Sequence, residues 1–514
     1  MKTIPLANIK SFNKLFVHYL NENPSTKQFY NLYPNIENFK TQIQNKKYSQ
    51  AQRQLLHKTF VNQYIGLELS SIQRQNIDNL LLENTFTVTT GHQLNIATGP
   101  LYVILKLVTT INLAKELAEK YPEYNFVPMY WMATEDHDFE EINHFYWGDE
   151  KKVWEQETSG AVGDILCENI PVNELFGFEM PAFVKEIYAS STTLADATRK
   201  LIQTLFHETG LLCLDANEIE LKTAFSSFFE QELIQKQSET LIQNTIQQFE
   251  KEGYKAQIHP REINLFYLDK NTRERIVFSK NEYLVNNTSL KFSEAEIIDL
   301  VKTSPEKFSP NVAFRPLYQE FTLPNLATVG GPAEIAYWLE LKSTFDFYKV
   351  EYPILVPRTS ALVINKNLTP KIDKLQISSE DLFLEEKELK NKVLEKLGAF
   401  PNLEKELQMW AAIANNLKEI APQVDVTLEA SAGAESAKGE KLLLDFEKRL
   451  QKAYEKKNEI VMRQLDVILA KLFPENGFQE RKHNYFYLAT QYENLLPTLL
   501  NEIKPLNFEF LILE

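Results

Sequence analysis

The segment 134–144, TEDHDFEEINH, is rich in ionisable side chains. Glu135, Asp136, His137 and Asp138 follow one another directly, and such a run is too polar for a protein core. Carboxylates can bind an ammonium group, and a histidine can transfer protons near neutral pH. We therefore predict a polar substrate pocket in which these four residues are the catalytic candidates.

A metal site is an alternative for the same segment. If residues 138–144 form a helix, His137, Glu141 and His144 lie near one helix face and could bind a divalent cation. The spacing is not that of HExxH, and Cys167 and Cys213 are poorly placed to contribute. A metal-dependent hydrolase and a plain solvated helix start both stay open.

A second cluster lies in the segment 91–100, GHQLNIATGP. Glycine lets the backbone approach a ligand, and the histidine and glutamine side chains add donors for a phosphate or a carboxylate. The spacing matches neither a Walker motif nor GxGxxG, so an ordinary strand-to-helix loop is the competing interpretation. The candidate anion-binding residues are Gly91, His92, Gln93, Thr98 and Gly99.

A third cluster lies between residues 311 and 358. Guanidinium groups bind carboxylates and phosphates through paired hydrogen bonds, which makes its two arginines candidates for anion binding. A lone arginine is more often part of a surface ion pair, and this alternative stays open. The candidate substrate-binding residues are Asn311, Arg315, Tyr318, Gly330, Gly331, Glu334, Tyr337 and Arg358.

Two strand–helix–strand units would position these clusters. The first has a strand at 85–90, a helix opened by Gly99-Pro100 and a second strand at 126–133, and the second unit repeats this layout over 309–364. Right-handed crossovers between parallel strands place both units at one sheet edge, where open α/β sheets bind ligands. Both helix N-termini would then present N–H groups to an anion.

The remaining chain suggests further domains around this α/β core. We expect a helical N-terminal lobe (1–84), a core (85–375) with insertions at about 145–195 and 255–305, a helical coiled-coil domain (376–480) and a tail that docks on the core (481–514). Within the core we expect a helix at 194–208, a buried strand at 210–216, one long helix from about 217 to 252 and a hairpin at 263–280.

The segment 380–480 has the pattern of charged, coiled-coil-like helices. Apolar residues recur at spacings of three and four, with one gap near Lys457. These residues are Leu443, Phe446, Leu450, Ala453, Val461, Leu465, Ile468 and Leu472. Segment 430–440, ASAGAESAKGE, is too small and polar for a core, so we expect either two antiparallel helices joined by a turn or one helix preceded by a loose loop. A stalk or a dimerisation arm would explain the pattern.

The composition is that of an acidic globular protein of 514 residues with a net charge of −15. This length exceeds one hydrophobic core, and the charge argues against a general nucleic-acid-binding surface. Two cysteines exclude a disulfide framework and a four-cysteine zinc site. No apolar run is long enough to span a membrane and the N-terminus lacks a secretory signal, so we expect a cytoplasmic protein.

Four sequence blocks resemble the bacillithiol biosynthesis family BshC. They are GHQLNIATGPLY, MATEDHDFEEINH, SPNVAFRPLYQEFTLPNLATVGGPAEIAYW and ILVPR. Their order and spacing match the family, as does the charged coiled-coil region, so the resemblance covers most of the chain. One position departs from the pattern, because the family often has glutamine where this chain has His92. Glutamine cannot transfer a proton, so a hydrogen-bond donor role for His92 is the better fit.

The resemblance implies a Rossmann-like core similar to class I nucleotidyl and aminoacyl transferases, with an inserted subdomain and a coiled-coil domain that mediates homodimerisation. It implies a ligase that joins L-cysteine to glucosaminyl malate through an amide bond, giving bacillithiol. Such chemistry would use residues 91–99 and 330–334 as an anion cradle, the 135–138 carboxylates to hold ammonium groups and His137 to deprotonate the amine. Arg315 or Arg358 would hold the malate carboxylates.

The activating group is left open by the sequence. Formation of an amide from a carboxylate commonly passes through an acyl-adenylate or an acyl-phosphate, so we expect ATP or another nucleotide, with or without a divalent metal. The sequence has no convincing KMSKS-like lysine loop for ATP. A non-enzymatic coiled-coil scaffold that binds a nucleotide or a thiol is a further alternative.

Overall fold

The computed structural model describes residues 2–398 and 402–514, which form two compact units. The first unit comprises the chain up to Val363 together with Gly477–Leu513, and the second comprises Ile364–Asn476. The chain therefore leaves the first unit once and returns to it near its end.

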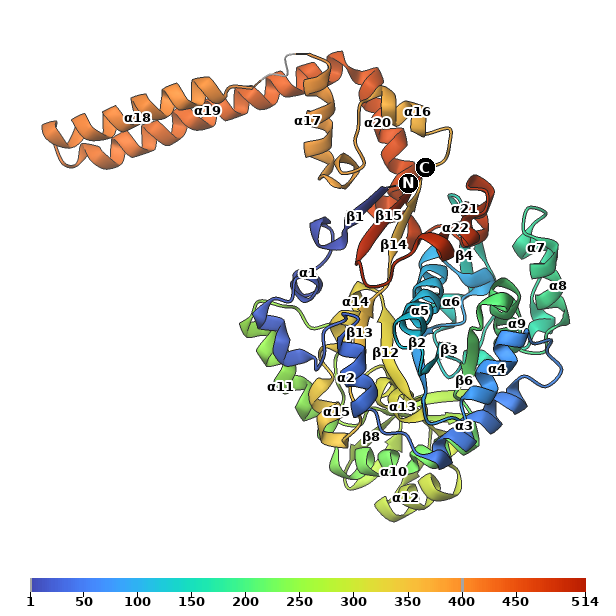
Figure 1. The fold of residues 1–514 in the computed structure, drawn as a ribbon. Helices are drawn as coiled ribbons and strands as arrows, with labels where there is room; N and C mark the ends of the chain where they lie inside the picture. Colours follow the sequence, from blue (N-terminus) through green and yellow to red (C-terminus); the bar gives the residue numbers. More distant parts are fainter. Residues whose placement is uncertain (1, 399–401) are drawn as a thin grey trace. The chain divides into compact units, whose positions relative to one another are not determined.

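A parallel sheet with the strand order β13-β12-β2-β3-β6 forms the centre of the first unit (Figure 1). Its strands are β2 (Thr85–His92), β3 (Asn125–Met132), β6 (Leu212–Asp215), β12 (Asn325–Gly330) and β13 (Ile354–Pro357). The chain adds strands on one side of β2 and then returns to add β12 and β13 on the other side. The order therefore reverses between β2 and β12, as in doubly wound Rossmann-like sheets. The predicted α/β core and its two strand–helix–strand units are confirmed.

Helix α5 (Leu101–Lys120) joins β2 to β3 and covers one face of the sheet (Figure 1). Its apolar side chains share a buried cluster with those of β2, β12 and β13. Pro100 is the N-cap of α5, one residue before the predicted position, whereas Pro332 is the first residue of α14 (Pro332–Trp338), as predicted. Lys106 is the only charged residue in 101–114, and it is 1% exposed.

The N-terminal segment and the C-terminal tail meet in a small sheet. Helices α1 (Lys14–Leu20), α2 (Asn38–Asn45), α3 (Gln50–Gln63) and α4 (Ser71–Asn79) follow a first strand that the sequence did not predict. This strand, β1 (Lys2–Pro5), pairs with β15 (Glu509–Leu513), which pairs with β14 (Ser360–Val363). The tail also contains α21 (Tyr485–Gln491) and α22 (Leu495–Glu502), and it belongs to the first unit.

The stretches predicted as insertions hold small antiparallel elements. The first contains the hairpin β4 (His144–Trp147) and β5 (Glu150–Val153), followed by α7 (Val172–Phe176) and α8 (Ala182–Ser190). The second contains β7 (Leu265–Asp269), β8 (Thr272–Ser279), β9 (Glu282–Val285), β10 (Lys291–Phe292) and α12 (Glu294–Thr303), and β11 (Phe308–Pro310) completes its sheet. We call this second sheet, β7 to β11, the inserted sheet. The predicted hairpin at 263–280 is confirmed as β7 and β8.

The segment between the two insertions confirms one predicted helix and corrects another. The predicted helix at 194–208 is confirmed as α9 (Leu194–Phe206). Elsewhere in the core, α15 (Lys342–Tyr348) follows α14. The single helix predicted over 217–252 is wrong, because the chain forms α10 (Ile219–Gln235) and α11 (Gln237–Lys251). Lys236 between them has a φ of +50°, which ends an α-helix. The break lets the Ser238 hydroxyl donate to the buried Glu232 carboxylate at 2.5 Å.

The second unit is helical. It contains α16 (Thr369–Lys374), α17 (Glu386–Lys396), α18 (Glu404–Val424), α19 (Leu428–Lys457) and α20 (Glu459–Leu472). Helices α18 and α19 lie side by side in opposite directions (Figure 1), and the gap near Lys457 is the break between α19 and α20. Within the described residues, every helix is too short or too polar to cross a bilayer.

The small residues of 430–440 are part of α19, so the loose-loop alternative is wrong. Their size has a packing reason. A Cβ on Gly439 would lie 1.8 Å from the Trp410 ring, and the Trp410 indole N–H donates to the Ser436 carbonyl at 2.9 Å. Small side chains here let the tryptophan of α18 lie directly against the α19 backbone.

Candidate active site

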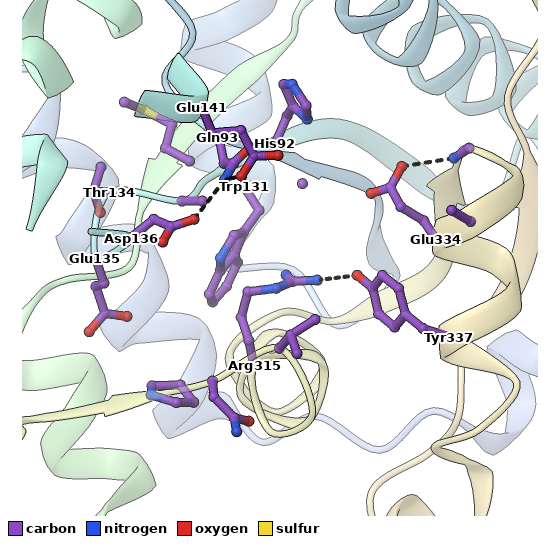
Figure 2. Close-up of a pocket in the computed structure, with 18 of the residues that line it drawn as sticks. His92, Gln93, Trp131, Thr134, Glu135, Asp136, Glu141, Arg315, Glu334 and Tyr337 are labelled. Carbon is purple, nitrogen blue, oxygen red and sulfur yellow. Dashed lines mark hydrogen bonds between the residues drawn. The ribbon is translucent and has the colours of Figure 1, made fainter. Parts of the chain in front are cut away.

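A cavity of about 700 Å³ opens where the strand order of the parallel sheet reverses (Figure 2). Its volume is in the range that holds small-molecule substrates. The ends of β2 and β3, the start of α14 and the inserted sheet contribute to its walls. The predicted site residues that line it are Gly91, His92, Gln93, Glu135, Asp136, Asn311, Arg315, Gly331, Glu334, Tyr337 and Arg358.

The other predicted site residues do not line this cavity. They are Thr98, Gly99, His137, Asp138, Tyr318 and Gly330. The tail holds the backbone on both sides of Thr98, because the Asn484 amide donates to the carbonyls of Ala97 and Gly99 at 2.7 Å each. Tyr318 is buried and donates to the Ala216 carbonyl at 2.8 Å, while Asp138 accepts from the backbone N–H of Glu141 at 3.2 Å. Tyr318 and Asp138 therefore hold nearby backbone segments in place and do not face the cavity.

Three carboxylates, of Glu135, Asp136 and Glu141, form an acidic wall of the cavity. The Gln93 amide donates to Asp136 and to Glu141, at 2.8 Å each, so the ends of β2 and β3 meet as predicted (Figure 2). Burial would raise the pKa of Asp136, but the charge of Arg273 and hydrogen bonds from the Gln93 amide and the His137 backbone N–H hold it well below its usual range. Asp136 is therefore ionised and suited to an ammonium group.

The alternative metal site of His137, Glu141 and His144, which required a helix over 138–144, is wrong. Helix α6 covers only Phe139–Ile142, and His144 already begins a strand, so the three side chains share no helix face. Within residues 2–398 and 402–514, no group of three or more His, Cys, Asp and Glu side chains is arranged to hold a metal ion.

Arg273 of the inserted sheet lines the cavity and holds the side chain of His137. Its Nη1 lies 2.8 Å from Nδ1 of His137 and 3.7 Å from Oδ1 of Asp136, and its guanidinium stacks on Phe266 at 4.1 Å. A guanidinium can only donate, so Nδ1 of His137 is the acceptor and the ring proton lies on Nε2. In this arrangement Nε2–H is the hydrogen-bond donor that the His137 ring keeps for other groups.

Lys106 links the two glycine-containing segments that the sequence predicted to meet. Its ammonium group donates to the Gly91 carbonyl and pairs with Oε1 of Glu334 at 2.8 Å, while Oε2 of Glu334 accepts from the Gly331 N–H at 2.8 Å. Burial lowers the pKa of Lys106, and Glu334 opposes this shift. The sequence analysis missed Lys106, although a lone lysine in an apolar helix was a usable signal.

His92 lies in the cavity wall beside this ion pair. Burial and then the charge of Lys106 lower the pKa of His92 to about 3, so its imidazole is neutral at physiological pH. The Tyr102 hydroxyl lies 3.4 Å from its Nε2. A hydrogen-bonding role therefore fits His92 better than proton transfer does.

Six arginines also line the cavity: Arg261, Arg273, Arg275, Arg315, Arg358 and Arg481. Arg315 donates to Gln319 at 2.9 Å and to the Tyr337 hydroxyl at 3.3 Å (Figure 2), and it pairs with no carboxylate of the described chain. Arg358 is buried and forms an ion pair with Glu480 at 2.7 Å. The other four arginines were not among the predicted site residues, although Arg273 and Arg275 lie within the hairpin predicted at 263–280.

Family models match both parts of the chain. Residues 1–359 match the model described as Bacillithiol biosynthesis BshC, N-terminal Rossmann-like domain, and residues 361–514 match the corresponding C-terminal coiled-coil domain. This chain belongs to the bacillithiol biosynthesis BshC family. The resemblance, the Rossmann-like core and the coiled-coil domain predicted from the sequence are thereby confirmed.

Full-length relatives support the BshC assignment. Three of them carry the name "Putative cysteine ligase BshC". The protein of Flavobacterium johnsoniae is 42% identical (98% of this chain and 97% of the relative), that of Flavobacterium psychrophilum 41% (98% and 97%) and that of Cytophaga hutchinsonii 38% (99% and 98%). A solved Campylobacter jejuni structure titled "putative arginyl t-RNA synthetase" covers 85% of this chain and 100% of its own, with 11% identity and a TM-score of 0.20, which is too low to support an argument.

Replacing Arg273 with methionine should release the His137 ring. The wild-type ring should hold its proton on Nε2, whereas the variant should populate both tautomers because Nδ1 loses its donor. The ring-nitrogen chemical shifts of His137, assigned with a His137→Gln variant, measure the difference. Arg275→Met is the matched control, since Arg275 lies two residues along the same strand. Identical His137 shifts in wild type and Arg273→Met would contradict the contact.

Proposed function

We propose that this protein is a cytoplasmic cysteine ligase that joins L-cysteine to glucosaminyl malate in the last step of bacillithiol biosynthesis. Membership of the BshC family and the names of its relatives support this activity. At the site, the observation that carries the proposal is an acidic wall and a set of arginines in one cavity. Cysteine brings an ammonium and a carboxylate, and the acceptor brings an amine and two carboxylates, so both signs of charge are needed.

The acidic wall is the proposed site for the amino groups. Asp136 is ionised, whereas Glu135 already pairs with the buried Lys222 at 2.5 Å. Glu141 lines the cavity and has no cationic partner within the described residues. We assign Asp136 to ammonium binding and Glu141 to accepting the proton that the attacking amine loses. His137, held by Arg273, then keeps Nε2–H as its donor.

The arginines of the core are the proposed site for the malate carboxylates. Arg358 is already paired with Glu480, so Arg315 has the freer guanidinium. In the proposed reaction, a carboxylate oxygen of cysteine first takes a phosphoryl or adenylyl group from ATP or another nucleotide, which releases the nucleoside diphosphate or pyrophosphate. The amine nitrogen then forms the amide bond with the carboxyl carbon as the phosphate or AMP leaves.

The direct test is an assay of the purified full-length protein. It is incubated with L-cysteine, glucosaminyl malate and each of several nucleoside triphosphates, with and without Mg²⁺ or Mn²⁺, and bacillithiol is measured by mass spectrometry. We expect product that depends on both substrates and on one nucleotide. Absence of bacillithiol under every combination would reject the ligase.

Replacing Arg315 with methionine should raise the KM for glucosaminyl malate about tenfold or more, because the variant loses a charge-assisted contact with the substrate.

Replacing His92 with glutamine should leave the activity almost intact. Glutamine keeps a donor, and the imidazole is neutral far above its pKa of about 3, so it contributes no titration near neutral pH. We expect kcat/KM within about threefold of wild type for His92→Gln and a loss of about tenfold for His92→Ala, which removes a hydrogen bond. The rate profiles of wild type and His92→Gln should superimpose between about pH 6 and pH 9. A pH dependence lost in His92→Gln would contradict this role.

We further propose that two copies associate through the α18–α19 hairpin. Helix α18 carries an exposed apolar stripe whose members are spaced by three or four residues, as in a coiled-coil seam. These residues are Met409, Ile413, Leu417, Ile420 and Val424. Their exposure supports a second copy of this chain as the partner, since large exposed apolar stripes mark association surfaces.

Introducing Ile413→Asp together with Leu417→Asp should halve the mass measured by light scattering while the helix content measured by circular dichroism stays unchanged. The matched control is Ala411→Asp with Asn415→Asp, which adds the same charge at the same spacing away from the stripe. The control should remain dimeric. A wild-type protein that is monomeric at micromolar concentration would refute the dimer.

A further inference from the structure

Some of the arginines that line the cavity have hydrogen-bond or ion-pair partners for their guanidinium groups, and others have none within the described residues. Arg273 donates to Ser309, to the Pro310 carbonyl and to His137, so it acts as a structural clamp. Arg261 and Arg275 also line the cavity, yet neither guanidinium meets a hydrogen-bond or ion-pair partner within residues 2–398 and 402–514. Two free guanidinium groups therefore belong to the inserted sheet and its leading segment.

The position of Arg275 follows from strand alternation. In β8, Arg273 and Arg275 are two residues apart and share one face, which lies toward the cavity. Phe266, directly opposite Arg275 on β7, lines the cavity as well, whereas Ile276 on the other face is 1% exposed. The inserted sheet thus turns a cationic and aromatic face to the cavity and an apolar face to its own core.

Three of the four carboxylates that line the cavity have cationic partners of their own, and the fourth, Glu141, accepts a hydrogen bond from Gln93. Glu135 pairs with Lys222 at 2.5 Å and Glu334 pairs with Lys106 at 2.8 Å, while Asp136 lies 3.7 Å from Arg273. Unpaired positive charge inside a concave wall raises the local concentration of anions, even though the whole chain carries a net charge of −15. Guanidinium forks match the oxygens of phosphates and carboxylates in particular.

We propose that Arg261 and Arg275 form a polyanion subsite on the inserted sheet, which takes a ligand group with at least two negative charges. This inference rests on the proposed ligase, whose substrates include two such groups: the phosphate chain of the activating nucleotide and the malate dicarboxylate. Arg315 of the core is a separate guanidinium without a carboxylate partner, so the cavity can bind two anionic groups at once. If the ligand of this subsite is the phosphate chain of the nucleotide, the two arginines take the place of the KMSKS-like lysine loop, which the sequence lacks.

Calorimetric titration of the full-length protein tests the subsite with two probes, inorganic tripolyphosphate and L-malate. We expect Arg261→Met and Arg275→Met each to weaken binding of one probe about tenfold, with a smaller loss for Arg275→Lys, which keeps the charge but not the fork. Loss of tripolyphosphate binding assigns the subsite to the nucleotide, and loss of malate binding assigns it to the acceptor. Added salt should reduce the difference between wild type and variants.

Lys302→Met is the matched control, because it removes one positive charge from exposed α12 of the same insertion and does not line the cavity. It should bind both probes as wild type does, and thermal melts should show that every variant is folded. The proposal fails if wild type binds neither probe, or if the arginine variants bind both as tightly as Lys302→Met. The readout is binding without turnover, so failure of the ligase assay is a separate result.

Discussion

A buried ammonium group joins the two halves of the candidate active site. Lys106 lies in the otherwise apolar part of α5, donates to the carbonyl at the end of β2 and pairs with Glu334 at the start of α14. Removing Glu334 would leave the buried ammonium group without a compensating charge, which destabilises the fold. The pair therefore fixes the spacing between β2 and α14, and with it the geometry of the cavity at the reversal of the strand order.

Around this fixed point the cavity is assembled from segments that are far apart in the sequence. The acidic wall comes from the end of β3 and is connected to β2 through Gln93. The inserted sheet provides Arg273, which orients His137, and the unengaged Arg275 beside it. The tail covers the start of α5 through Asn484 and neutralises Arg358 through Glu480. The parallel sheet thus contributes the residues at the ends of β2 and β3, and the inserted sheet and the tail contribute further charged side chains.

The helical second unit follows a different packing rule. Small residues in α19 let Trp410 of α18 lie against the backbone at Gly439, so this hairpin is held by close helix approach. The stripe from Met409 to Val424 remains exposed on α18. The same sequence therefore encodes one close contact within the hairpin and a free apolar surface suited to a second chain.

The sequence by itself determined the features that depend on local pattern. Strands β2 and β3, the glycine-containing turns, Pro332 at the start of α14 and the family blocks were all predictable, because periodicity and backbone restrictions act within a few residues. Tertiary structure alone decided which side chains meet. Arg273 donates to His137 from more than a hundred residues away, and Asn484 of the tail donates to the carbonyls of Ala97 and Gly99. Hydrogen-bond and ion-pair partners of this kind are set by the folded arrangement, and no spacing in the sequence encodes them.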